Sequence, residues 1–257
     1  TAFAAETHWV AAGDMESDGF SAADGEEALR GDITFGDVSA SVSYVLADSA
    51  GVRNTGDDLE QLSIGVTAAF GGMDLAVGYQ DGSMNAADAA AYAAANADFN
   101  NNEVFGLSVA TSYSGADVRL AYADNGTTNS IGVNVAYPLG PVTATAYYVA
   151  ESAGGDNWGI NLAYENGPIA VTLDYQDDQG TGDWGLEGSY DVGNGLTIFA
   201  GMADSGEDTY IGGLYDLGSG ASLLVSLADD ADADNGDDEI GANDYQEGTT
   251  VELSFAF

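Results

Sequence analysis

The side chains that could carry chemistry in this sequence are almost all carboxylates. The chain has 257 residues, of which 43 are Asp or Glu, against three arginines, one histidine and no cysteine. The lack of cysteine excludes a thiol nucleophile and a Cys-based zinc site, and no residues at a suitable spacing from His8 would complete a triad or a zinc site. We therefore expect no catalytic residues and no enzyme activity. The formal charge of −40 also excludes nucleic acid as a partner, because like charges repel.

The acidic segment that begins at Asp230 resembles a calcium-binding loop, because aspartates occupy alternate positions. It fails as an EF-hand, since its glycine comes seventh instead of sixth and no glutamate occupies the twelfth place. The weak candidates for a metal site are Asp230, Asp232 and Asp234. They either bind divalent cations such as Ca2+ loosely or stay hydrated, and no other cofactor is expected.

The residues between these charges alternate strictly in polarity. In residues 38–44, apolar side chains occupy the even positions and serines the odd ones, and large apolar side chains likewise occupy every second position in residues 131–137 and 158–164. A period of two predicts β-strands with one apolar and one polar face. No apolar run is long enough for a transmembrane helix. Any membrane span must therefore be built from strands.

Two kinds of connection separate the expected strands. At one end an aromatic residue is followed closely by glycine, as at Phe35-Gly36 and Phe70-Gly71, and glycine supplies the positive φ of tight hairpins. At the other end the connections are longer and acidic: 49–58, 81–101, 125–129, 152–156, 178–182, 205–208 and 230–247. Short turns on one side and long loops on the other are typical of an outer-membrane β-barrel, with an aromatic girdle at the turn side.

The strand count predicts a closed barrel formed by residues 1–257 as a single domain. From Leu29 onward the alternation predicts fifteen strands, and an up-and-down barrel needs an even number. Residues 4–12, which include His8 and Trp9, are expected to supply the sixteenth, as the first strand. The fold class is thus all-β, a transmembrane antiparallel up-and-down barrel of sixteen strands.

The sequence resembles the general diffusion porins of the Gram-negative outer membrane, most of all those of alphaproteobacteria. The likeness lies in the 62–80 hairpin with its Phe70-Gly71 turn, in the 215–222 turn, and in the terminal Phe257. The resemblance implies a channel for passive diffusion of small hydrophilic solutes and a homotrimer in contact with outer-membrane lipid and lipopolysaccharide. It also implies that Phe257 is the signal read by the barrel-insertion machinery, and that the third external loop folds inward as a constriction.

The polar face should line the pore, because lipid cannot hydrogen-bond a polar side chain. Wall carboxylates of one sign favour cations. Residues 81–101 form the expected constriction loop, with a short helix over residues 89–95, and residues 230–247 an acidic external loop. The expected pore-lining and constriction residues are Arg30, Asp32, Asp74, Asp88, Asp98, Glu103, Asp117 and Arg119.

Two further questions stay open on the sequence alone. Arg30 and Arg119 either face Asp88, Asp98 and Glu103 across the pore, or Arg30 merely pairs with its neighbour Asp32. The whole chain has one rival interpretation, a secreted or surface-exposed, salt-adapted all-β structural or adhesion protein, since a β-sandwich also alternates in polarity. A sandwich, however, gives no reason for an aromatic residue at the same end of every hairpin.

Overall fold

The structure is a computed structural model, and it describes residues 3–21, 27–47, 61–82, 102–230, 239–240 and 245–256. One short helix, α1 (Ala4–His8), begins the described chain. Apart from one 3-10 turn at Asp204–Gly206, the remaining regular structure in these ranges is β-sheet. No helix in the described ranges is both long and apolar enough to cross a membrane.

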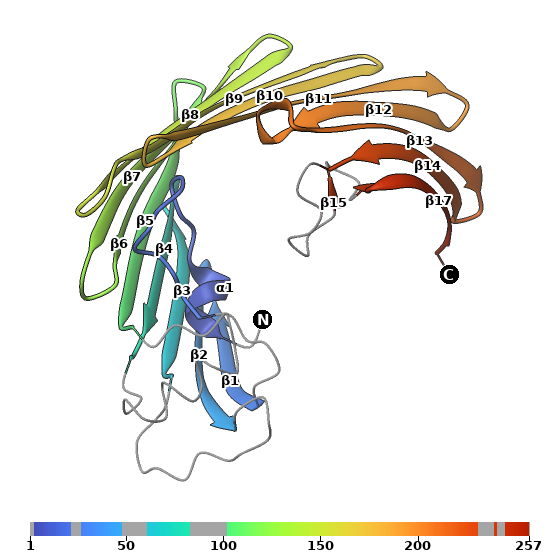
Figure 1. Ribbon diagram of the computed structural model, residues 1–257. Coiled ribbons are helices and arrows are strands. Elements are labelled where there is room, and N and C mark those ends of the chain that lie inside the picture. Colours follow the sequence, from blue (N-terminus) through green and yellow to red (C-terminus); the bar gives the residue numbers. More distant parts are fainter. Residues whose placement is uncertain are drawn as a thin grey trace. The chain divides into compact units, whose positions relative to one another are not determined.

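Fifteen strands among the described residues follow one another in chain order in one antiparallel sheet (Figure 1). They are β1 (Glu27–Phe35), β2 (Val38–Ala47), β3 (Ser63–Phe70), β4 (Met73–Gln80), β5 (Val104–Tyr113), β6 (Ala116–Asp124), β7 (Asn129–Leu139), β8 (Val142–Glu151), β9 (Asn157–Asn166), β10 (Ile169–Asp178), β11 (Thr181–Gly193), β12 (Leu196–Ala203), β13 (Asp208–Gly218), β14 (Ala221–Asp229) and β17 (Gly248–Phe255). A separate pair, β15 (Glu239–Ile240) and β16 (Tyr245–Gln246), lies in the connection between β14 and β17.

The short connections form as the glycine pattern predicts. Two residues link β1 to β2, β3 to β4 and β5 to β6, and the same holds for each of the other hairpins with an aromatic-glycine signature. Positive φ angles occur there, for example at Gly36 (58°) and at Ser114 and Gly115 (55° and 85°). Such angles give the backbone the twist that a two-residue hairpin requires. One expected long connection is wrong: residues 178–182 contain a two-residue turn, because Gln179 (48°) and Gly180 (94°) both adopt positive φ.

The expected first strand over residues 4–12 is also wrong. Residues 4–8 form α1, and residues 9–21 continue as an irregular chain, so His8 ends a helix instead of lying in a strand. Alanine has the highest helix propensity, and no two-residue alternation runs through this stretch. Helix α1 packs against β2, β3 and β4 (Figure 1).

The contacts divide the chain into two compact units, which are described separately. Unit 1 comprises Thr1–Val135 and Tyr147–Trp158, and unit 2 comprises Ala136–Ala146 and Gly159–Phe257. In unit 1 a small core forms where residues 3–21 meet the sheet, around Ala12, Met15, Ala121, Ala123 and Val149. In unit 2 the corresponding core is Tyr210, Ala228 and Tyr245.

Candidate functional site

In a water-soluble protein the exposed face of a sheet is polar and the buried face is apolar. In this sheet the exposed face is apolar and the covered face is polar. Large apolar side chains are exposed on one face, with Phe35 at 85%, Ile33 at 68% and Val251 at 68% exposure. The buried polar residues on the other face are mainly small: Ser41, Ser43, Ser63, Gln80, Ser108, Ser130, Asn157 and Ser226. An apolar face exposed over so many strands suits lipid and not water. The polar face is therefore the candidate functional surface.

Arg30 and Asp32, both on β1, are brought together on the polar face. The Arg30 Nε donates to Asp32 Oδ1 at 2.7 Å, and the Ser41 hydroxyl donates to the same oxygen at 2.5 Å. The Arg30 guanidinium also donates to the Thr7 hydroxyl of residues 3–21 at 3.0 Å. The structure contains the ion pair between Arg30 and Asp32, one of the two interactions expected for Arg30. Arg30 additionally holds the N-terminal residues.

Asp74 and Arg119 lie in one transverse row of the polar face. Asp74 of β4 is paired with Ala110 of β5, which is paired in turn with Arg119 of β6. Because strands are about 4.8 Å apart, the backbones of the two charged residues are separated by about 10 Å across the small Ala110 side chain. Asp117 lies on the same face and accepts a hydrogen bond from Ser112 at 2.5 Å.

The other predicted site residues are less directly involved or lie beyond the described ranges. Glu103 precedes β5 and accepts a hydrogen bond from the Tyr79 hydroxyl at 3.2 Å. Asp230 is buried at the end of β14. Asp88, Asp98, Asp232, Asp234 and Phe257, with most of the 81–101 loop, lie outside the described residues.

Residues 3–21, which we call the N-terminal segment, lie on the polar face of unit 1. The segment's backbone N–H groups are hydrogen-bonded by side chains of the wall. Ala4 and Ala5, whose amides have no partner within a helix this short, donate to Ser43 Oγ at 2.9 Å and to Ser63 Oγ at 2.7 Å. Ser21 donates to Gln80 Oε1 at 2.7 Å. Arg30, Ser43, Ser63 and Gln80 are consecutive partners across four strands, so they form one row.

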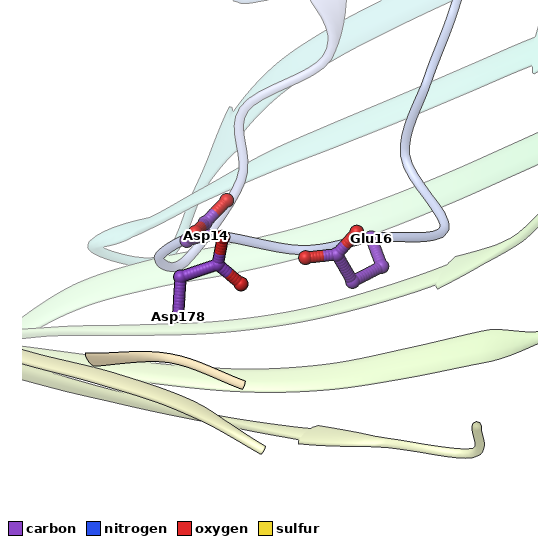
Figure 2. Close-up of side chains that lie close together, drawn as sticks. All are labelled: Asp14, Glu16 and Asp178. Atoms are coloured by element: carbon purple, nitrogen blue, oxygen red, sulfur yellow. The ribbon is translucent and has the colours of Figure 1, made fainter. Parts of the chain in front are cut away.

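Two of the segment's four carboxylates, those of Asp14 and Glu16, are exposed. Met15 and Ser17 are buried, whereas the intervening Asp14 and Glu16 are exposed. Figure 2 shows the Asp14 and Glu16 side chains on the segment. Asn157 of β9 holds this stretch, because its Nδ2 donates to the Asp14 carbonyl at 3.0 Å and to Glu16 Oε1 at 3.1 Å. The segment therefore adds negative charge to the open side of the polar face.

The surroundings of Asp18 on the segment shift its pKa. Burial raises the pKa of Asp18 above its ordinary value of 3.8, and the neighbouring Asp14 and Glu151 carboxylates raise it further, while the hydrogen bond from Trp9 lowers it. Burial is the largest of these effects. The charged form of Asp18 is thus disfavoured while the segment lies on the wall.

Sequence reasoning missed this segment, although a signal was present. Gly65, Gly78 and Gly106 interrupt three successive alternating strands at polar-face positions. Glycine inside a strand often marks a place where another backbone approaches closely. Such a pattern on three neighbouring strands would have pointed to an occupant of the polar face.

In unit 2, Tyr245 from the connection between β14 and β17 packs onto the polar face of the sheet. Tyr245 of β16 is fully buried, and its ring lies 4.9 Å from the Tyr210 ring of β13, centroid to centroid. The Tyr210 hydroxyl donates to Glu187 Oε1 of β11 at 2.6 Å. A Cβ at Gly212 would lie 2.8 Å from the Tyr245 ring, so this glycine makes room for it. Glu187 is thereby tied to an aromatic cluster on the same face.

Comparison with known proteins agrees with this architecture. The family model described as Gram-negative porin matches residues 2–149 and 83–237. A multiply substituted mutant of Rh. blastica porin is similar in structure, with 19% identity, a TM-score of 0.52 and coverage of 90% of this chain and 89% of that one. Another mutant of that porin has 17% identity, a TM-score of 0.51 and coverage of 88% and 86%. No curated protein matches the chain.

The family match spans more than half of the chain, and the polarity of the two faces agrees with it. This overturns the interpretation as a secreted salt-adapted protein, because such a protein would not expose an apolar face over successive strands. The chain belongs to the Gram-negative porin family: it is an antiparallel transmembrane β-barrel of the outer membrane and a channel for passive diffusion.

Proposed function

We propose that the channel prefers cations to anions. The observation that carries this proposal is the excess of carboxylates on the polar face. In unit 1, Asp32, Asp74 and Asp117 accompany Arg30 and Arg119, and the N-terminal segment adds Asp14 and Glu16. Unit 2 contributes Asp174, Glu187 and Glu252 on the corresponding face of its strands. Fixed carboxylates within a Debye length of about 8 Å attract cations and repel anions.

The test is the reversal potential of single channels in a planar bilayer under a KCl gradient. The expected sign is that of potassium moving down its gradient. Asp74→Asn should lower the preference, because it removes a wall charge. Asp37→Asn is the matched control, since Asp37 lies in the turn between β1 and β2 and not on a strand of the wall. A wild-type channel that favours chloride would overturn the proposal.

We also propose that residues 81–101 narrow the pore, with Asp88 and Asp98 facing the lumen. This is the constriction expected from the family resemblance. The wall around Ser43 and Ser63 is occupied by the N-terminal segment, so the loop would contact a different part of the wall. Deletion of residues 86–97 should raise conductance in a barrel that still assembles.

The remaining proposals concern assembly and partners. The chain would act as one barrel domain and as a homotrimer, in contact with lipid and lipopolysaccharide, with Phe257 as the signal for the insertion machinery. Sedimentation in detergent giving only monomer would contradict the trimer. Neither enzyme activity nor nucleic-acid binding is proposed. Loose binding of divalent cations at Asp230, Asp232 and Asp234 is testable by calcium titration of the assembled protein.

A further inference from the structure

We propose that the N-terminal segment is a resident constriction of the pore, which stays on the lumen wall during conduction and sets the size and charge of the passage. This inference rests on the channel function and goes beyond it. It assigns part of the selectivity to residues that precede the first sheet strand, instead of to an external loop alone. Three independent features of unit 1 carry it.

The first feature is the hydrogen bonding of the segment's backbone. Besides Ala4, Ala5 and Ser21, the amide of Glu16 donates to Glu151 Oε1 at 3.1 Å and that of Ser17 to Ser130 Oγ at 3.0 Å. The partners come from strands β2, β3, β4, β7 and β8. A chain lying in an aqueous lumen could leave its amides to water. Here the wall supplies the acceptors, several of them fully buried, so the wall and the segment fit each other.

The second feature is a row of small residues beneath the segment. Ser41, Gly65, Gly78, Gly106 and Ala123 are consecutive partners across β2 to β6, and we call them the glycine row. A Cβ at Gly65 would lie 2.6 Å from the His8 Cβ, and a Cβ at Gly78 would lie 2.9 Å from the Phe20 ring. A Cβ at Gly106 would overlap the Trp9 ring. The wall is therefore hollowed in the places where the segment's side chains lie.

The third feature is the division of the segment into a buried and an exposed side. Phe3, Ala4, Ala5, Ala12, Met15, Ser17 and Ser21 are buried against the wall. The Trp9 and Phe20 rings pack against each other with centroids 5.9 Å apart, which closes the segment on itself. Releasing the segment would expose these apolar side chains to the water of the lumen. The exposed side carries Asp14 and Glu16, so permeating ions meet carboxylates.

A disulfide lock tests whether the segment stays in place. A Cβ at Gly132 would lie 3.2 Å from the Ala12 Cβ, a few tenths of an ångström short of the Cβ–Cβ spacing of a disulfide, which is about 3.5–4.5 Å, and the natural chain has no cysteine. The double variant Ala12→Cys with Gly132→Cys should oxidise readily. Its single-channel conductance should be the same before and after reduction. A conductance that rises on reduction would show that the segment leaves the wall, and failure of the disulfide to form would also overturn the proposal.

A displacement variant tests whether the segment narrows the pore. Gly106→Leu should push Trp9 off the wall and raise both single-channel conductance and the uptake of larger neutral sugars by liposomes. The control is Gly185→Leu, where a Cβ lies 3.5 Å from the Met202 carbonyl and meets no part of the segment. It adds the same bulk to the polar face and should not raise conductance. Equal or lower conductance in assembled Gly106→Leu contradicts the proposal.

The wild-type channel separates this inference from the proposed cation preference. If the wild type favours anions but Gly106→Leu conducts more than Gly185→Leu, only the charge preference fails. If the wild type favours cations and the displacement variant behaves like its control, only the constriction fails. Assembly of each variant is checked by the shift in gel mobility between unheated and heated samples.

Discussion

The indole N–H of Trp9 donates a hydrogen bond to the Asp18 carboxylate at 3.0 Å, which links two residues nine positions apart within the N-terminal segment. The carboxylate is partly buried, and the Asp14 and Glu151 carboxylates act on it as like charges. The hydrogen bond offsets only part of this penalty. The docking of the segment on the wall should therefore depend on pH through the protonation of Asp18.

The first prediction is that the segment is held more tightly in acid. The pKa of Asp18 is raised on the wall relative to its ordinary value of 3.8. A raised value means that docking is strongest below the ordinary pKa and weakens as pH rises through the raised one. A nitroxide attached at Val10→Cys, a partly exposed position, should be less mobile near pH 4 than at pH 7. Asp18→Asn should abolish this change, because the amide stays neutral and its oxygen still accepts from Trp9.

A pH dependence that persists unchanged in Asp18→Asn would contradict this prediction. Conductance is not a suitable readout here, because protonation of the wall carboxylates also alters ion flow. The mobility of the label follows the segment alone.

The second prediction concerns the wall serines. Ser63→Ala removes the acceptor of the Ala5 amide and leaves a buried N–H without a partner, which should weaken docking by about 1–3 kcal/mol. Ser39→Ala is the matched control, since the Ser39 hydroxyl is hydrogen-bonded to Thr34 Oγ1 at 3.1 Å, within the β1–β2 hairpin. Amide hydrogen exchange of Ala5 should accelerate in the first variant only. Equal protection of Ala5 in the two variants would argue against the role of Ser63.

The third prediction tests the sidedness of the sheet. Leu173 and Thr172 are neighbours on β10, with Leu173 paired to Leu186 on the apolar face and Thr172 paired to Glu187 on the polar face. Leu173→Arg should cost about 2–4 kcal/mol if it lies at the middle of the bilayer, and less toward the rims. Thr172→Arg should be tolerated beside Glu187. Urea titration of refolding into lipid vesicles measures both, and equal costs would contradict the assignment of the faces.

Much of the fold could be predicted from the sequence because strand alternation and hairpin glycines are local signals. The fifteen strands expected after Leu29 match the fifteen of the main sheet among the described residues. That Arg30, Asp32, Asp74, Asp117 and Arg119 share the polar face followed from the same period. The turn at Gln179 was misjudged because its acidic neighbours resemble those of the longer connections.

The N-terminal segment could not be predicted in this way, because its partners are distant in the chain. Ala4 is hydrogen-bonded to Ser43, and Ser17 to Ser130, across 39 and 113 positions. Nothing within residues 4–12 encodes those acceptors. The strand count favoured a sixteenth strand there because closure of a barrel needs an even number, yet the helix-favouring alanines and the acceptors on the wall determine a different structure. The one sequence signal for the docked segment is the set of three glycines in the glycine row, which lie on the neighbouring strands β3, β4 and β5.

The last prediction concerns Tyr245, which anchors the connection between β14 and β17 to the polar face of unit 2. Its ring is fully buried between Tyr210 and the hollow left by Gly212. Removing a fully buried aromatic ring costs about 3–5 kcal/mol in a packed core. We expect Tyr245→Ala to detach this anchor, to raise single-channel conductance, and to make the 230–247 connection more sensitive to proteinase K in intact membranes. Tyr137→Ala, on the apolar face, is the control and should change neither property. If Tyr245→Ala is cleaved no faster than wild type, the buried ring does not hold the connection inward.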